Sequence, residues 1–261
     1  MKKISLNIGI SLLSQIVAFA YGLVLPRLIL EQFGSQVNGL IQSIGQVLGI
    51  IGLLDMGVGQ VVRSALYRPL EEQNRDQISR IMVSGGRFYR KIAYMLLGYV
   101  MVLVIAYPML VDHSFGWQFV AGMIVIMAIG SFAQYYFGVI QEQLLHASQK
   151  SYLIYSLQIL CHVFNMAVCI CLVHLDCSIH TVKLATAAIF LMKPLFYTCY
   201  IRRNYSIDWK ISYEAEPIRQ KWHGVAQHIS AVVLDGTDNI VLTLFSTLSN
   251  VSIYSVYYMV I

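Results

Sequence analysis

Long stretches without charge constrain this chain more than any other feature. Residues 4–25, 92–111, 117–140 and 151–173 contain no Asp, Glu, Lys or Arg. Each stretch is long enough to cross the roughly 30 Å hydrocarbon core of a bilayer as a helix. Only 12% of the residues are charged and the mean hydropathy is +0.65, whereas a soluble domain of this length needs charged faces at helical spacing. The chain is therefore predicted to lie in a lipid bilayer.

Further apolar segments extend this pattern. Residues 37–63, 179–201 and 224–248 are apolar with a few charges, and residues 251–261 begin another such segment. The pattern predicts seven full spans and part of an eighth. Backbone amides in lipid must be satisfied within each segment, and the alternation of a membrane β-barrel strand is absent, so we expect an all-α bundle of transmembrane helices. The chain ends at Ile261 inside an apolar segment, which predicts a fragment or a truncated product.

Loop charges predict that the N-terminus lies in the cytoplasm. In that orientation the inner segments are 1–3, 64–91, 143–150 and 202–223, and together with Arg63 they hold 15 of the 18 Lys and Arg residues. Cytoplasmic loops of membrane proteins are rich in Lys and Arg, and the opposite orientation would violate this rule. The net charge of +5 therefore indicates topology and contact with anionic headgroups, and it does not predict nucleic-acid binding.

Residues suited to metal binding or covalent catalysis form no recognisable motif. The five cysteines include no C-x-x-C pair, so neither a disulfide framework nor a zinc site is predicted. His174, Asp176, Cys177 and His180 lie near one another on an outer loop, but their spacing fits no metal site of defined geometry. The chain has no G-x-S-x-G, Walker or H-E-x-x-H motif. We therefore expect no metal, no cofactor and no enzymatic activity.

Ionisable residues within spans are costly in lipid, so each one is a candidate for function. Arg27 follows Pro26 near the outer end of the first span, where it either snorkels to the interface or binds an anion in a central cavity. Lys183 lies about one turn from the outer end of its span and is expected to snorkel. Lys193 lies deeper, directly before Pro194, which removes a backbone donor and loosens the helix. It either binds a phosphate or another anion in a cavity or reaches the inner headgroups.

Asp55 lies in a glycine-rich part of the second span, G-L-L-D-M-G-V-G at residues 52–59. The glycines, Gly57 and Gly59 among them, make this helix thin enough for neighbouring backbones to approach closely. We expect Asp55, Gly57 and Gly59 to have a structural or gating role. The simplest form of that role pairs Asp55 with a basic residue such as Arg63.

The seventh predicted span is the most polar. Asp235, Asp238 and Asn239 stand at i, i+3 and i+4 and therefore share one helical face, which His228 extends. Two carboxylates close together in a low dielectric titrate as a coupled pair, which is typical of a proton or cation site. Alternatively, they pair with a cationic residue of another helix or lie at the outer mouth.

Three blocks carry a resemblance to a known family. The segment 52–59 resembles the L-D-x-G-x-G signature at the end of the second helix in the multidrug/oligosaccharidyl-lipid/polysaccharide transporter superfamily. Residues 87–94, R-F-Y-R-K-I-A-Y, resemble the start of its third helix. Most specifically, T-D-N-I-V-L at 237–242 followed by V-S-I-Y-S at 251–255 is similar to the D-N-I-V-I…V-G-x-Y-S signature of its bacterial polysaccharide-export flippases.

This resemblance implies a protein of about twelve to fourteen helices in two related lobes. Residues 1–201 would form the first lobe with six helices, 202–223 a cytoplasmic connector, and 224–261 the start of the second lobe. Such a protein moves an undecaprenyl-pyrophosphate-linked oligosaccharide from the inner to the outer leaflet of the bacterial cytoplasmic membrane. It works by alternating access and neither makes nor breaks a bond.

The resemblance also suggests roles for the candidate residues. Arg27 and Lys193 would contact the anionic headgroup of the lipid-linked oligosaccharide. Asp235 and Asp238, with Asn239 beside them, would bind a coupling ion or neutralise those cations in the resting state. The expected partners are the lipid-linked substrate, the phospholipid bilayer and the enzymes of polysaccharide assembly.

Two other functions compete with the flippase. A drug–cation antiporter of the same superfamily would use the acidic residues of the seventh span to bind cationic drugs, but the lysines within the membrane count against it. A membrane enzyme acting on polyprenyl-linked glycans would need large outer loops to enclose a reaction site. The predicted outer loops, 31–36, 112–116, 174–178 and 249–250, are too short for that.

Overall fold

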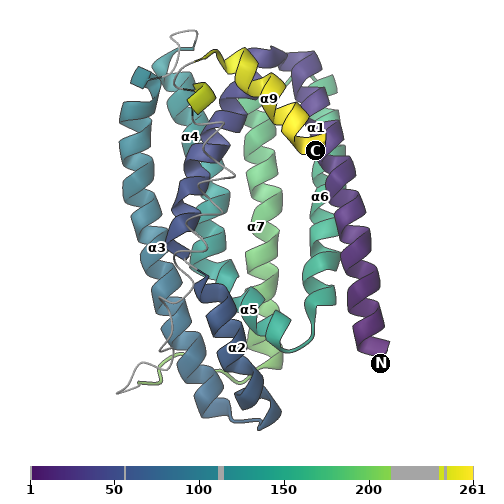
Figure 1. The fold of residues 1–261 in the computed structure, drawn as a ribbon, viewed down its shortest axis with the longest axis vertical. Helices are drawn as coiled ribbons and strands as arrows, with labels where there is room; N and C mark the ends of the chain where they lie inside the picture. Colours follow the sequence, from purple (N-terminus) through teal and green to yellow (C-terminus); the bar gives the residue numbers. More distant parts are fainter. Residues whose placement is uncertain (1, 56, 111–114, 213–240, 244–245, 261) are drawn as a thin grey trace.

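The computed structural model describes residues 2–55, 57–110, 115–212, 241–243 and 246–260, and every regular element in these ranges is a helix. The elements are α1 (Lys2–Gly49), η1 (Ile50–Asp55), α2 (Val58–Glu71), α3 (Arg75–Leu110), α4 (Trp117–Ala133), η2 (Gln134–Gly138), α5 (Val139–Ala147), α6 (Ser151–His174), α7 (Ile179–Asn204) and α9 (Leu248–Val260) (Figure 1). The short elements η1 and η2 are a 3₁₀ helix and a π-helix. The predicted all-α class is confirmed for the described part of the chain.

Five helical segments of the described part are long and apolar enough to cross a membrane. They are Ser5–Gly52, Arg75–Met109, Trp117–Ala147, Ser151–His174 and Ile179–Asn204. These segments contain nearly all of the first, third, fourth, fifth and sixth predicted spans and most of the second, 37–63. The seventh predicted span, 224–248, lies mainly outside the described residues.

Their outer faces are apolar as well. Ile16, Met101 and Met109 are 66%, 68% and 74% exposed, and many other large apolar side chains are exposed with them. A helix that is apolar on its outer face as well as its inner face is suited to lipid rather than to water. We therefore treat the protein as a multi-pass membrane protein.

The first long helical element folds back on itself at Gly34. The backbone of Gly34 is non-helical, with φ +83° and ψ 169°, so α1 consists of two arms, residues 2–33 and 35–49. Glycine has no Cβ and adopts positive φ without the steric penalty of other residues. The chain turns there at the end of the bundle opposite the N-terminus (Figure 1). This turn lies within the predicted outer loop 31–36.

The second predicted span, 37–63, is not one continuous helix. It runs through the second arm of α1, changes to the 3₁₀ helix η1 and resumes as α2 after Gly57, whose φ is +72°. A left-handed residue cannot belong to an α-helix, and only glycine adopts this conformation routinely. The prediction of an uninterrupted helix is therefore wrong at residues 50–55 and at Gly57, because the glycines permit a break as readily as a thin helix.

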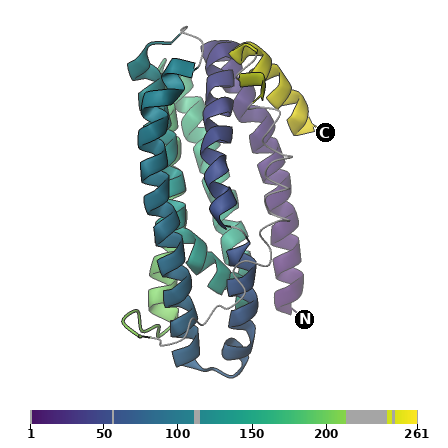
Figure 2. The ribbon, with the colours of Figure 1, turned by 60° about the vertical axis from the view of Figure 1, so that its left-hand side comes forward.

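The predicted cytoplasmic segment 64–91 is almost entirely helical. The helix α2 continues to Glu71, and α3 begins at Arg75, with Asn74 Oδ1 accepting the Gln77 backbone N–H at 3.1 Å as an N-cap. This α2–α3 hairpin lies at the same end of the bundle as the N-terminus and the C-terminal end of α7 (Figures 1 and 2). This basic end is the one that the positive-inside rule predicts to face the cytoplasm.

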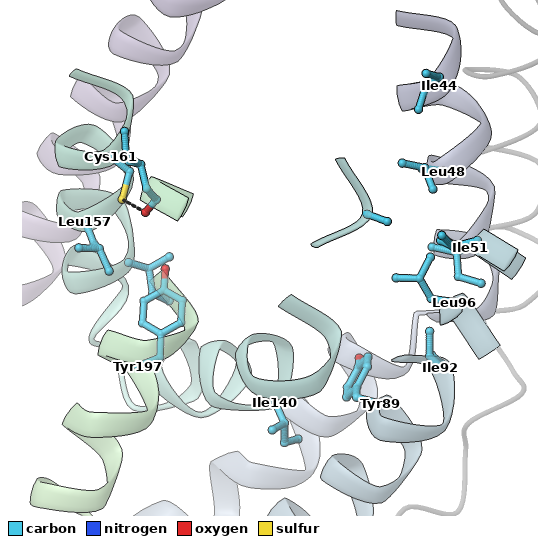
Figure 3. Packing of buried hydrophobic residues seen from close by; sticks show 14 of the residues in the cluster. Ile44, Leu48, Ile51, Tyr89, Ile92, Leu96, Ile140, Leu157, Cys161 and Tyr197 are labelled. Atoms are coloured by element: carbon cyan, nitrogen blue, oxygen red, sulfur yellow. Dashed lines mark hydrogen bonds between the residues drawn. The ribbon is translucent and has the colours of Figure 1, made fainter. Parts of the chain in front are cut away.

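The interior of the bundle is lined by apolar side chains from every long helix. The first arm of α1 packs on α6, α7 packs on α4 and α6, and α5 packs on α2. Figure 3 shows Tyr89 of α3 and Tyr197 of α7 on opposite sides of Ile140 of α5, all three buried. This packing brings polar groups of α3, α5 and α7 together in the half of the bundle that lies toward the N-terminus, which we call the inner half.

Candidate functional site

Arg27 lies on the exposed surface of α1. Its Nε donates to Glu31 Oε1 at 2.8 Å, and the two side chains are 80% and 63% exposed. Each residue is thus neutralised by the other, one helical turn apart. The structure does not bring Arg27 together with Lys193, so the two predicted headgroup cations do not form a common site.

Asp55 forms its main contact with α3. Its carboxylate accepts a hydrogen bond from the Tyr89 hydroxyl at 2.6 Å. The predicted partner, Arg63, instead donates to Gln143 Oε1 of α5 at 3.0 Å, and no ion pair joins it to Asp55. Asp55 therefore ties the end of η1 to α3, at the point where the second span is interrupted.

Gly57 and Gly59 allow these contacts to form. Gly57 stands in the left-handed conformation at the start of α2. A Cβ at Gly59 would lie 3.0 Å from Gln143 Nε2 and 3.2 Å from the Tyr89 hydroxyl, which is closer than ordinary packing. The two glycines thus position α2 against α3 and α5, and their gating role stays a prediction.

Lys193 lies in the C-terminal half of α7. The helix continues through Pro194, so the predicted loosening does not break it, and Thr198 Oγ1 donates to the Pro194 carbonyl at 2.9 Å. The half-buried Lys193 places its Nζ 5.8 Å from the centre of the Phe190 ring. It interacts electrostatically with Glu142 of α5. Lys193 is therefore a cation inside the bundle, with an acidic residue on the neighbouring helix.

Lys183 lies on the same helix, nearer its outer end. Its side chain is half-buried, and the ammonium interacts electrostatically with Cys169 of α6. Cys169 is buried and lies 3.6 Å from Thr186 Oγ1 of α7. Lys183 thus lies beside the contact between α6 and α7. The sequence had instead predicted a side chain that extends to the membrane interface.

Glu142 is the functional candidate that sequence reasoning missed. Gln134 Nε2 donates to Glu142 Oε2 at 2.9 Å, and Glu142 Oε1 lies 3.7 Å from His146 Nε2. The Glu142 and His146 side chains are 26% and 13% exposed. The sequence does contain one indication of this site: Glu142 and His146 stand at i and i+4 and therefore share one helical face. It was overlooked because Glu142 lies two residues beyond the charge-free stretch 117–140, where charges are ordinary.

A π-helix places Gln134 beside Glu142. The element η2 begins at Gln134 and ends at Gly138, between α4 and α5. A Cβ at Gly138 would lie 2.6 Å from Gln134 Oε1, so only glycine leaves room for this amide. Single π-turns are uncommon in proteins, and those that do occur are often found at functional sites.

Two buried polar atoms near Lys193 have no hydrogen-bond partner within the described ranges. They are the hydroxyl of Tyr197, a fully buried residue of α7 (Figure 3), and Nδ1 of His162 on α6. Tyr197 interacts electrostatically with Glu142, and His162 interacts with Lys193. The His162 ring also stacks on Tyr21 of α1, with ring centres 4.6 Å apart. Buried polar atoms without partners are exceptional and indicate positions where a ligand or water binds.

The remaining candidates give no site in the described part of the chain. Asp235, Asp238 and Asn239 lie outside the described residues, as does His228. Of the outer-loop group, His180 Nε2 lies 2.9 Å from the Phe119 carbonyl oxygen. Within the described ranges, no group of three His, Cys, Asp or Glu side chains is placed to hold a metal ion.

The Glu142 cluster (Gln134, Glu142, His146, Lys193 and Tyr197) thus gathers polar groups from η2, α5 and α7. It combines a carboxylate, a cation and proton-carrying groups in surroundings that are otherwise apolar. Such an arrangement can bind an anion at Lys193 or a proton at Glu142. No family model matches the chain, and no similar curated protein or solved structure is found.

Proposed function

We propose that this protein moves an undecaprenyl-pyrophosphate-linked oligosaccharide across the bacterial cytoplasmic membrane by alternating access. The observation that supports this most is the position of Lys193, which is half-buried inside a bundle of membrane helices. Ionisable residues at such positions mark substrate or ion pathways, because a cation in lipid is costly. A diphosphate headgroup needs a cation of this kind on its way through the membrane.

A polar seam at the outer end of the bundle supports alternating access. Ser35, Asn38 and Ser43 of α1 are hydrogen-bonded to Ser249, Ser252 and Thr243, each at 2.7 Å. These three bonds, the α1 seam, join the first predicted lobe to the start of the second, at the end opposite the N-terminus (Figures 1 and 2). We infer that the α1 seam is an outer gate, closed in the conformation described and broken when the protein opens outward.

The sequence blocks at 52–59, at 87–94 and at 237–242 with 251–255 are a further line of support. In this proposal Lys193 contacts the diphosphate, while Arg27 contributes less because Glu31 already neutralises it. Asp235, Asp238 and Asn239 remain the predicted coupling-ion site of the second lobe.

A drug–cation antiporter is the alternative that one observation favours. The Glu142 side chain is 26% exposed, and within the described ranges the group that lies within 4 Å of it as an ion-pair partner is His146, so a cationic drug could bind there. The cluster would then act as an acidic site, and Lys193 would oppose substrate binding. No residue of the Glu142 cluster specifically favours the third function, that of a membrane enzyme acting on polyprenyl-linked glycans.

Complementation separates these functions. The full-length gene would be expressed in bacteria that lack their capsule flippase, as wild type and as Lys193→Met, Lys193→Arg and Lys183→Met. Surface polysaccharide should be restored by wild type, retained by Lys193→Arg and Lys183→Met, and reduced at least tenfold by Lys193→Met. Lys183→Met is the matched control because it removes a lysine from the same helix.

Two results would contradict the proposal. The first is no surface polysaccharide in several capsule backgrounds although the wild-type protein is present in the membrane. The second is resistance to cationic drugs that depends on Glu142, which would favour the antiporter.

A further inference from the structure

The headgroup contact proposed for Lys193 does not use the rest of the Glu142 cluster. A lysine that only binds an anion has no need of a carboxylate nearby, since the carboxylate competes with the anion. Yet the structure holds Glu142 in place with Gln134, and it does so through a π-helix and a glycine that leaves room for the amide. This arrangement favours a role for Glu142 itself.

Titratable groups face Glu142 from its own helix and from two of the elements packed around it. His146 stands one turn further along α5, and Lys193 and Tyr197 come from α7. Tyr89 of α3 is an electrostatic neighbour as well, but its hydroxyl is already donated to Asp55.

The remaining neighbouring elements contribute neutral groups or groups engaged elsewhere. The amide of Gln134 comes from η2, and Ser151 of α6 lies 2.8 Å from His146 Nδ1. Arg63 of α2 is hydrogen-bonded to Gln143 rather than to Glu142. In the described part of the chain, Lys193 is therefore the cationic side chain that a neighbouring helix presents to Glu142, beside the Gln134 amide and His146.

We propose that Glu142 is a proton-binding site and that its protonation frees Lys193 to bind an anion. While Glu142 is ionised, its charge offsets that of Lys193, and an anionic headgroup gains little by approaching. When Oε1 or Oε2 takes up a proton, the cluster becomes more positive by one charge, and the attraction of Lys193 for a diphosphate is no longer opposed. The identity of the anion rests on the proposed function, whereas the proton site does not.

The Tyr197 hydroxyl and His146 fit this scheme. The Tyr197 hydroxyl is fully buried and unpartnered within the described ranges, so it can donate to a bound anion. His146 connects Glu142 to Ser151, close to the start of α6 at the cytoplasmic end. His146 Nε2 lies 3.7 Å from Glu142 Oε1, beyond hydrogen-bond distance, so a proton passes between them only when the two side chains move closer.

By linkage, proton and anion then strengthen each other's binding. An anion that binds at Lys193 raises the affinity of Glu142 for a proton by the same factor by which the proton raises the affinity for the anion. Proton binding can therefore be measured without any transport, and the anion can be replaced by a simple probe.

Carbodiimide labelling tests the proton site directly. Dicyclohexylcarbodiimide reacts with protonated carboxyl groups in apolar surroundings, and mass spectrometry locates the product. In purified full-length protein, labelling of Glu142 should decrease as the pH rises, and Glu142→Gln should remove it. In Lys193→Met the midpoint should move to higher pH by about one unit, because an opposite charge that favours ionisation is lost.

Matched variants separate this effect from damage to the fold. Lys193→Arg keeps the charge, and Lys183→Met removes another lysine of α7, so both should keep the wild-type midpoint. Added inorganic pyrophosphate should raise the midpoint in wild type and leave it unchanged in Lys193→Met. Melting temperatures of all variants show whether each is folded.

Three results would overturn the inference. They are no labelling of Glu142 at any pH at which the protein stays folded, a midpoint that is the same in Lys193→Met and wild type, and a midpoint that pyrophosphate does not move in wild type. Failure of the proposed function is distinguishable, because it appears as lost complementation while the labelling pattern persists.

Discussion

Gly39→Ala is expected to open the α1 seam. Gly39 lies on the second arm of α1, next to Asn38, and a Cβ there would collide with the backbone carbonyl of Leu248 in α9. A backbone carbonyl in a helix cannot rotate away as a side chain can. The two helices must therefore separate, and the three hydrogen bonds of the seam are lengthened together.

The size of the effect follows from these bonds. Hydrogen bonds between membrane helices contribute on average about 0.6 kcal/mol each. Loss of the three bonds of the α1 seam would therefore weaken its closed form by about 1.8 kcal/mol, which lowers the ratio of closed to open protein roughly 20-fold. Asn38 and Ser252 are both buried, so their bond is the one whose loss should matter most.

Disulfide trapping measures this population. Ser35 Oγ and Ser249 Oγ lie 2.7 Å apart, so Ser35→Cys with Ser249→Cys should cross-link rapidly in a protein whose five natural cysteines have been replaced. Adding Gly39→Ala should slow cross-linking, by up to about 20-fold, because the rate follows the closed population. Gly9→Ala is the matched control, since it also adds a methyl group to α1 but meets nothing within 4 Å. Equal cross-linking rates in the two variants would refute the reasoning.

Two further predictions concern the inner half of the bundle. Tyr89→Phe removes the hydrogen bond to Asp55 and should lower the free energy of unfolding by about 1–3 kcal/mol, measured as a lower melting temperature; an unchanged melting temperature would show that the bond does not hold η1 to α3. Gly138→Ala should displace the Gln134 amide from Glu142 and change the pH profile of carbodiimide labelling at Glu142, and an unaltered profile would mean that the π-helix does not position this amide.

The helical class and the apolar segments could be predicted because lipid imposes length and hydrophobicity on each span directly. The turn near Gly34 was predicted for the same reason, as a short polar interval between two apolar runs. The break at residues 50–55 and at Gly57 was not predicted. A glycine-rich sequence is compatible both with a thin helix and with a left-handed residue, and the contact of Asp55 with Tyr89 is among the tertiary features that distinguish them.

Partners were harder to predict than positions. Arg63 was the nearest basic residue to Asp55 in sequence, but the packing of α2 on α5 brings it to Gln143 instead. Glu142 was passed over because a carboxylate just beyond an apolar run usually faces water. Its contact with Gln134 depends on the extra residue of a π-turn, which no periodicity of the sequence reveals.

The most direct test of the proposed function is a flipping assay with purified full-length protein in sealed liposomes. A lipid-linked oligosaccharide with a diphosphate headgroup would be placed in one leaflet, and its appearance in the other followed by the access of a sugar-binding protein. We predict transfer in minutes with wild type and at least tenfold slower transfer with Lys193→Met, while Lys193→Arg and Lys183→Met remain close to wild type. Transfer no faster than in empty liposomes, by protein that is folded and correctly inserted, would contradict the account.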